Sequence, residues 1–236
     1  MARKVRKGEE HRMVEPKRSY SYDVSQYGRP YAGPKHKLTS VAEMRDITVA
    51  VLILTAAFFM IIYTSAGRGV FYYLGLAGLS VVAGFFVHEM SHKAVARRYG
   101  CWAEFRADYK MLGLALVMSF FGFLWAAPGA VLIMGKIGPK ENGRISLAGP
   151  GSNLLVALAS LPFALFTVDG SPTAASDVAG GLYFFSVFLG AFNMIPILPF
   201  DGAKIWHWNK PIYVATLLAA GLLLAVAHFW LGLRLF

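Results

Sequence analysis

Two histidines four residues apart, His88 and His92, enclose Glu89 in the pattern H-E-x-x-H. In a helix, residues four apart share one face, so both imidazoles can reach a single metal ion. Glu89 then lies beside the metal, where a carboxylate can handle the protons of a bound water. The pattern predicts a zinc site with a hydrolytic role. The alternative, two helix-end histidines beside a solvated glutamate, is disfavoured because ionisable groups near an apolar segment are costly and usually functional.

Zinc held by two histidines needs a third protein ligand and an open position. The single cysteine, Cys101, excludes an internal disulfide and a cysteine cage. Asp201 is the best candidate, because it follows a long apolar run in which Pro196 and Pro199 should open the helix. The alternative is an ordinary helix-end aspartate at the level of the lipid headgroups. We expect one Zn²⁺ per chain, with three ligands: His88, His92 and Asp201.

The whole chain has the composition of a membrane protein. Of its 236 residues, 56% are hydrophobic and only 15% are charged. In a soluble domain about a quarter of the residues are charged. We therefore predict a multi-pass integral membrane protein, most simply of the cell membrane.

The chain has a net charge of +10, and its basic residues are concentrated near the N-terminus. Eleven of the 23 basic residues precede the first apolar segment: Arg3, Lys4, Arg6, Lys7, Arg12, Lys17, Arg18, Arg29, Lys35, Lys37 and Arg45. The positive-inside rule then predicts a cytoplasmic N-terminus. This segment contains no recognisable nucleic-acid-binding module, and anionic lipid headgroups are the simpler partner. We expect contacts with membrane lipids and none with nucleic acid.

The chain divides into two predicted parts. We predict that residues 1–46 form a basic arm that is disordered or lies on a surface. We predict that residues 47–236 form a membrane-embedded domain, because a spanning helix needs about 20 apolar residues and several such runs occur. The fold class is an all-α polytopic membrane protein with five to six transmembrane helices. The predicted spans are 47–65, 70–92, 145–168, 181–206 and 212–236.

A further apolar run, residues 111–134, lies between the second and third spans. If it crossed the membrane once, His88 and Asp201 would end on opposite faces, too far apart to share a metal ion. Its interior contains Gly113, Gly122, Pro128 and Gly129, and broken backbone at membrane depth is tolerated only inside protein or beside a water-filled cavity. We therefore predict a re-entrant element with strand or loop character that lines the site. An ordinary spanning helix is the alternative.

Three motifs together resemble the signatures of the site-2 protease family. They are His88-Glu89-x-x-His92, Gly149-Pro150-x-x-Asn153 and Asn193-x-x-Pro196-x-x-Pro199-x-Asp201-Gly202, each on its own apolar segment. The resemblance implies that His88, His92 and Asp201 bind zinc and that Glu89 is the catalytic acid and base. It also implies that Asn153 helps to hold the substrate or the oxyanion. From the residues alone, Asn153 and Asn193 are either active-site donors or amides that link helices.

The resemblance implies an intramembrane zinc metalloprotease that hydrolyses peptide bonds in or near transmembrane segments of other proteins. A transmembrane protein is therefore the expected substrate. A membrane transporter or metal channel would also account for polar groups on broken helices, but it does not call for Glu89 between two ligands. A membrane protease of the prenyl-protein processing type shares the H-E-x-x-H pattern, but its third ligand is usually a glutamate. The oligomeric state cannot be read from the sequence.

Overall fold

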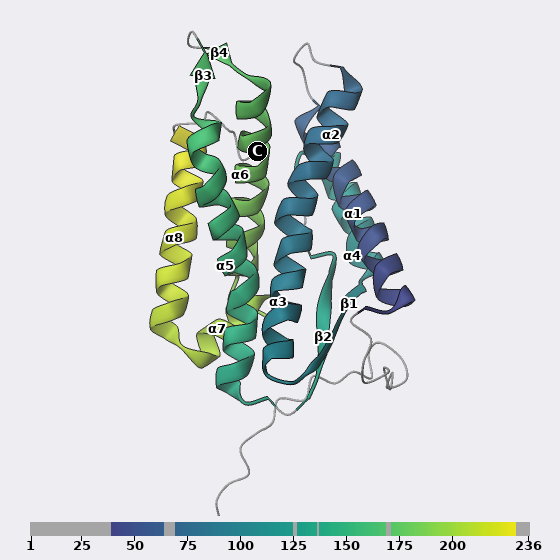
Figure 1. The fold of residues 1–236 in the computed structure, drawn as a ribbon, viewed down its shortest axis with the longest axis vertical. Helices are drawn as coiled ribbons and strands as arrows, with labels where there is room; N and C mark the ends of the chain where they lie inside the picture. The colour runs from purple at the N-terminus through teal and green to yellow at the C-terminus, as the bar shows by residue number, and fades with distance from the viewer. Residues whose placement is uncertain (1–38, 64–68, 125–126, 136, 169–170, 230–236) are drawn as a thin grey trace, which may run out of the picture.

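The computed structural model describes residues 39–63, 69–124, 127–135, 137–168 and 171–229 (Figure 1). Within this part of the chain, five helices are long and apolar enough to cross a membrane. They run side by side along the long axis of the molecule (Figure 1). The predicted polytopic helical fold is confirmed, with the addition of two small two-stranded sheets.

The first helix, α1 (Val41–Ile62), begins six residues before the predicted start at residue 47. Ser40 caps it, because its hydroxyl accepts a hydrogen bond from the Glu43 backbone N–H at 3.1 Å. Glu43 and Asp46 are buried and hydrogen-bonded, so these polar residues belong to the packed domain and not to the predicted arm. The rest of that arm, residues 1–38, lies outside the described residues.

The second span is one continuous helix, residues 70–98, composed of α2 (Val70–Val81), a π-helical turn η2 (Val82–Phe86) and α3 (Val87–Arg98). The prediction ended this span at residue 92. The helix continues because Lys93 is buried against an acidic partner on α1 and so needs no exit to water. π-Helical turns inside α-helices occur frequently at functional sites.

The element predicted over 111–134 was expected to have strand or loop character; it belongs to a longer strand–helix–strand unit that begins at residue 102 and contains a short helix. Its parts are β1 (Trp102–Ala107), α4 (Tyr109–Ser119) and β2 (Gly129–Met134). Helix α4 has 11 residues, about 17 Å, which is too short to cross an apolar core of about 30 Å. Strand β2 pairs antiparallel with β1, so the chain returns to the side from which it left. The run therefore makes no net crossing, as the placement of the metal ligands required.

The second half of the chain forms three more spans and a short helix. These are α5 (Pro139–Ala164), α6 (Ala174–Asn193), α7 (Asp201–Trp208) and α8 (Lys210–Phe229), with a small hairpin of β3 (Thr167–Val168) and β4 (Ser171–Pro172) between α5 and α6. Helix α5 packs most extensively against α6 and also packs against α3 and α7. It therefore lies between the elements that carry the predicted metal ligands.

Helix boundaries in this half differ from the predicted ones. Helix α5 begins at Pro139 instead of residue 145, because the Glu141 side chain accepts the Gly138 N–H at 2.9 Å. Helix α6 begins at Ala174, after the capping residue Thr173. It ends at Asn193, so the span predicted over 181–206 was wrong in continuing into α7. The two prolines that follow account for the break. Residues 230–236 of the last predicted span lie outside the described residues.

Candidate metal centre

Helix α3 presents His88 and His92 on one face, as their spacing predicted. Both side chains are buried, and their Nε2 atoms are 3.0 Å apart. The two rings meet nearly at right angles, with an interplanar angle of 81°. Two nitrogen atoms therefore converge on one point, from a helix that extends ten residues beyond His88 to Arg98.

Asp201 brings the third ligand from the first residue of α7. Its Oδ2 atom lies 3.4 Å from His88 Nε2 and 3.0 Å from His92 Nε2. The helix start is a favourable place for a carboxylate, because the N-terminal end of the helix dipole is positive. The chain reaches it by folding closely onto the end of α6: a Cβ at Gly202 would lie 2.3 Å from the Met194 carbonyl oxygen. Only glycine fits there.

Hydrogen bonds to the far side of each ring determine which nitrogens face the centre. His92 Nδ1 lies 2.7 Å from the Ile145 carbonyl oxygen, which can only accept, so this nitrogen carries the proton. Asn153 donates its amide N–H to the Ser186 carbonyl at 3.1 Å, so its Oδ1 atom faces His88 Nδ1 at 3.0 Å and accepts from it. Both Nε2 atoms are therefore unprotonated and offer lone pairs.

The three ligand atoms fit a zinc ion. With the ring protons on Nδ1, two lone-pair nitrogens and a carboxylate oxygen converge on one point, an arrangement that a cation stabilises. Zinc ligands at 2.0–2.1 Å in tetrahedral geometry are about 3.3 Å apart, close to the 3.0–3.4 Å separations observed. Among the described residues, His88, His92 and Asp201 form the one group of three potential ligands that lie within 4.8 Å of one another. The predicted ligand set is thus brought together.

Gly149 on α5 covers the metal-binding face of the histidines. A Cβ at this position would lie 2.3 Å from His92 Nε2 and 2.5 Å from His88 Nε2. Gly151, two residues further on, would meet nothing within 4 Å. Gly149 therefore provides space at the metal site.

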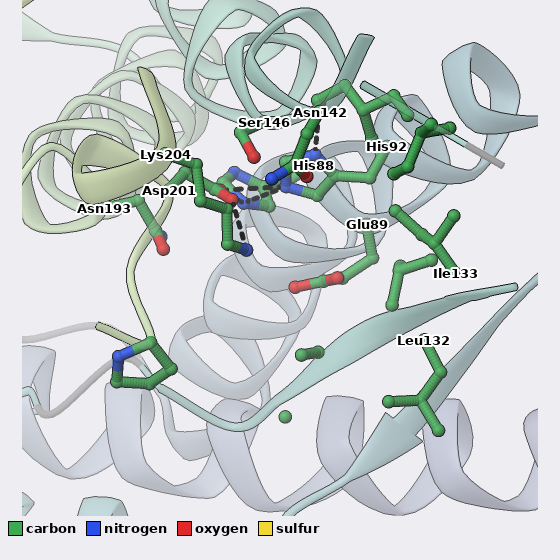
Figure 2. Close-up of a pocket in the computed structure, with 16 residues that line it drawn as sticks. His88, Glu89, His92, Leu132, Ile133, Asn142, Ser146, Asn193, Asp201 and Lys204 are labelled. Atoms are coloured by element: carbon green, nitrogen blue, oxygen red, sulfur yellow. Dashed lines mark hydrogen bonds and ion pairs between the residues drawn. The ribbon is translucent and has the colours of Figure 1, made fainter. Parts of the chain in front are cut away.

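The metal ligands open onto a cavity of about 270 Å³. Figure 2 shows Glu89 extending into it, between the metal ligands and the strand that carries Leu132 and Ile133. Asn193 also lines the cavity, and its amide donates to the Leu189 carbonyl at 3.0 Å. Asn153 does not line it and is almost fully buried. Of the two asparagines singled out, Asn193 faces the cavity and Asn153 faces the back of a ligand.

Comparison with known proteins shows the family to which this chain belongs. The chain is 39% identical over 176 residues to a protein of Methanocaldococcus jannaschii named "Putative zinc metalloprotease MJ0611", covering 74% of this chain and 88% of that protein. The chain belongs to the site-2 protease family of zinc metalloproteases. Zinc is accordingly the metal of the site formed by the histidines and the aspartate.

Other proteins named as zinc metalloproteases match smaller parts of the chain. "Putative zinc metalloprotease Rip3" of Mycobacterium tuberculosis is 30% identical over 147 residues, which is 60% of this chain and 33% of that protein. "Zinc metalloprotease MJ0392" of M. jannaschii is 32% identical over 123 residues, half of this chain and 30% of that protein. No family model matches the chain. No solved structure matches it either.

One cation of this site-2 protease site was not predicted as a site residue. Lys204 lines the cavity, and its ammonium lies 3.4 Å from Asp201 Oδ1, the oxygen turned away from the histidines (Figure 2). The spacing of Lys204, three residues after Asp201 on a helix, was the available signal, because residues three apart are neighbours on a helix surface.

Proposed function

We propose that this metalloprotease cuts peptide bonds within or near the transmembrane segments of other membrane proteins. The observation that carries the proposal is the depth of the metal centre. His88 lies ten residues before the end of a membrane-length helix, about 15 Å along its axis. The cavity beside it is lined by residues of α3, α5, α7 and β2. A substrate that reaches this cavity therefore comes from the membrane interior or its edge.

The groups of the cavity have distinct roles in the proposed hydrolysis. Bound zinc supplies Lewis-acid polarisation and acidifies a water molecule. Glu89, which is not among the three ligands, accepts the proton of the attacking water and then donates it to the leaving amine. Asn193, which lines the cavity together with Asn142, is the proposed donor to the developing oxyanion. Asn153 acts differently, by holding His88 in the ligating tautomer.

The substrate must be extended at the cut, since a helix hides its carbonyl groups in internal hydrogen bonds. Strand β2 offers a template for an extended segment. Asp108 N–H donates to the Pro128 carbonyl at 2.9 Å, so these two residues form a hydrogen-bonded pair. Along antiparallel strands, pairs that are hydrogen-bonded to each other alternate with pairs that are not. The backbone groups that point away from β1 are therefore those of Gly129, Val131 and Ile133. All three residues line the cavity. We infer that the substrate lies along this edge of β2.

Glu89→Gln tests the proposal most directly. The change keeps the size of the side chain and removes its proton acceptor, so the protein should still bind one zinc per chain. Cleavage of a model membrane-spanning substrate in proteoliposomes should fall by about 10²-fold to 10⁴-fold, as expected for a lost general base. His92→Ala should lose zinc and cleavage together. If the Glu89→Gln protein cleaves at close to the wild-type rate, the assignment of the base is wrong.

Orientation in the membrane is part of the same proposal. From the basic N-terminal segment we infer that the N-terminus and the metal-bearing ends of the helices lie on the cytoplasmic side. Substrates would then be cut nearer to their cytoplasmic end. The short connection between α5 and α6 would lie on the outer side of the membrane.

A further inference from the structure

Two carboxylates in the first turns of α1 are buried at the edge of the small sheet. Glu43 has no exposed surface and Asp46 retains 3%. They lie three residues apart, on the face of α1 that packs against β1. Buried acidic side chains at the start of a membrane-spanning helix are costly and call for an explanation.

Each carboxylate accepts a hydrogen bond from the backbone of β1. Phe105 N–H donates to Glu43 Oε1 at 3.1 Å, and Ala107 N–H donates to Asp46 Oδ2 at 3.4 Å. Tyr109 also donates its hydroxyl to Asp46, at 2.9 Å. In β1, the backbone groups of Phe105 and Ala107 point away from β2. The reason is the alternation of hydrogen-bonded and non-hydrogen-bonded pairs that also turns the backbone groups of Val131 and Gly129 away from β1. The carboxylates thus occupy the outer edge of β1 and leave the edge of β2 for the cavity.

Glu43 is also bound to the helix that carries the metal ligands. Lys93 on α3 places its ammonium 2.6 and 2.5 Å from the two carboxylate oxygens, and it is itself only 5% exposed. Lys93 lies one turn after Glu89 on the same helix. A buried ion pair is weak support for stability, because desolvation offsets its attraction. Its other use is to hold two elements in one arrangement.

The β1 residues that bind the carboxylates lie opposite the β2 residues whose outer backbone groups face the cavity. Phe105 is directly opposite Val131, and Ala107 is directly opposite Gly129. Opposed residues in such pairs have Cα atoms about 4.5 Å apart. A single carboxylate, that of Glu43, therefore connects α3 to the strand residue that lies behind Val131 at the cavity edge.

We propose that Glu43, with Lys93 and Asp46, is a positioning residue that sets the height of the β1–β2 pair along α3. This aligns the free edge of β2, and a substrate bound to it, with Glu89 and the zinc ligands. The inference rests on the proposed function, because it assumes that the substrate lies along β2. It assigns no chemical step to Glu43, which does not line the cavity.

Amide hydrogen exchange tests the anchor without any cleavage assay. In the Glu43→Ala protein, exchange in segments 102–107 and 129–134 should be faster by at least tenfold than in the wild type. In the Tyr183→Phe protein, these segments should exchange as in the wild type. That control removes a buried hydroxyl that donates to the Leu223 carbonyl at 2.7 Å and links α6 to α8. Unchanged exchange in Glu43→Ala would overturn the proposal, even if the enzyme cleaves as proposed.

Kinetics and product analysis test the consequence for the substrate. Glu43→Ala should raise KM at least tenfold, keep kcat within threefold, retain one zinc and cut at additional neighbouring bonds. Glu43→Gln keeps an oxygen for Phe105 N–H, so its KM should rise by about threefold and its cut site should stay unique. The measurements on Glu43→Gln test the proposal even if the alanine variant does not fold. A change in kcat alone, with one cut site, would contradict a positioning role.

A charge exchange separates the ion pair from the strand contact. Glu43→Lys combined with Lys93→Glu restores opposite charges, but an ammonium cannot accept the Phe105 N–H. We expect KM to stay at least tenfold raised in the double variant. Full recovery of KM would show that only the link between helices matters and would overturn the role of the strand contact. A wild-type protein that cleaves no membrane substrate would refute the proposed function, while the exchange measurement would still decide whether Glu43 anchors the sheet.

Discussion

Replacing Gly149 by alanine should remove zinc without changing any ligand. The new Cβ would lie 2.3 and 2.5 Å from the Nε2 atoms of His92 and His88. Ordinary contact between carbon and nitrogen needs about 3.4 Å, so the rings or α5 must move by roughly 1 Å. Metal–ligand distances tolerate only about 0.2 Å. We expect zinc affinity to fall at least 100-fold, about 2.8 kcal/mol.

The matched control is Gly151→Ala on the same helix, where the added carbon would meet nothing within 4 Å. Alanine in a helix interior is more stable than glycine by about 0.5–1 kcal/mol, so both variants gain helix propensity. Zinc competition with a chromophoric chelator should then separate them, with Gly151→Ala retaining wild-type affinity. Removal of zinc should lower the Tm of the wild type and of Gly151→Ala, but not that of Gly149→Ala. If Gly149→Ala binds zinc within threefold of the wild type, the reasoning from this contact is refuted.

Two further predictions concern Asn153 and the orientation of the chain. Asn153→Leu should weaken zinc binding 10-fold to 100-fold by leaving His88 Nδ1–H without its acceptor, yet keep most of kcat at saturating zinc. A large fall in kcat at full zinc occupancy would instead indicate an oxyanion role. After replacement of Cys101, single cysteines at Lys110 and Lys140 should react with an impermeant reagent from the cytoplasmic side, and one at Ala175 only from outside. Labelling of the first two from opposite sides would contradict the re-entrant fold.

The sequence by itself predicted which residues converge on a metal site and that the run between them makes no net crossing. A helix has a fixed period, so His88 and His92 had to share a face, and Glu89 had to lie next to them. The ~30 Å thickness of the apolar core then constrained the topology. Asp201 could meet the histidines only if residues 111–134 returned to their starting side. Local composition and a distance limit were sufficient for both inferences.

Tertiary structure decided what surrounds that site. Asn153 orients His88 instead of facing the cavity, which depends on how α5 packs against α3 and α6 and cannot be read from a motif. Gly149 and Lys204 became site residues for the same reason. The polar start of α1 was expected to belong to the arm. The partner that allows Glu43 to be buried, Lys93, lies 50 residues later in the chain, so the sequence around Glu43 showed no sign of burial. Such contacts join distant segments, and the free energy that pays for burying their charges exists only in the folded protein.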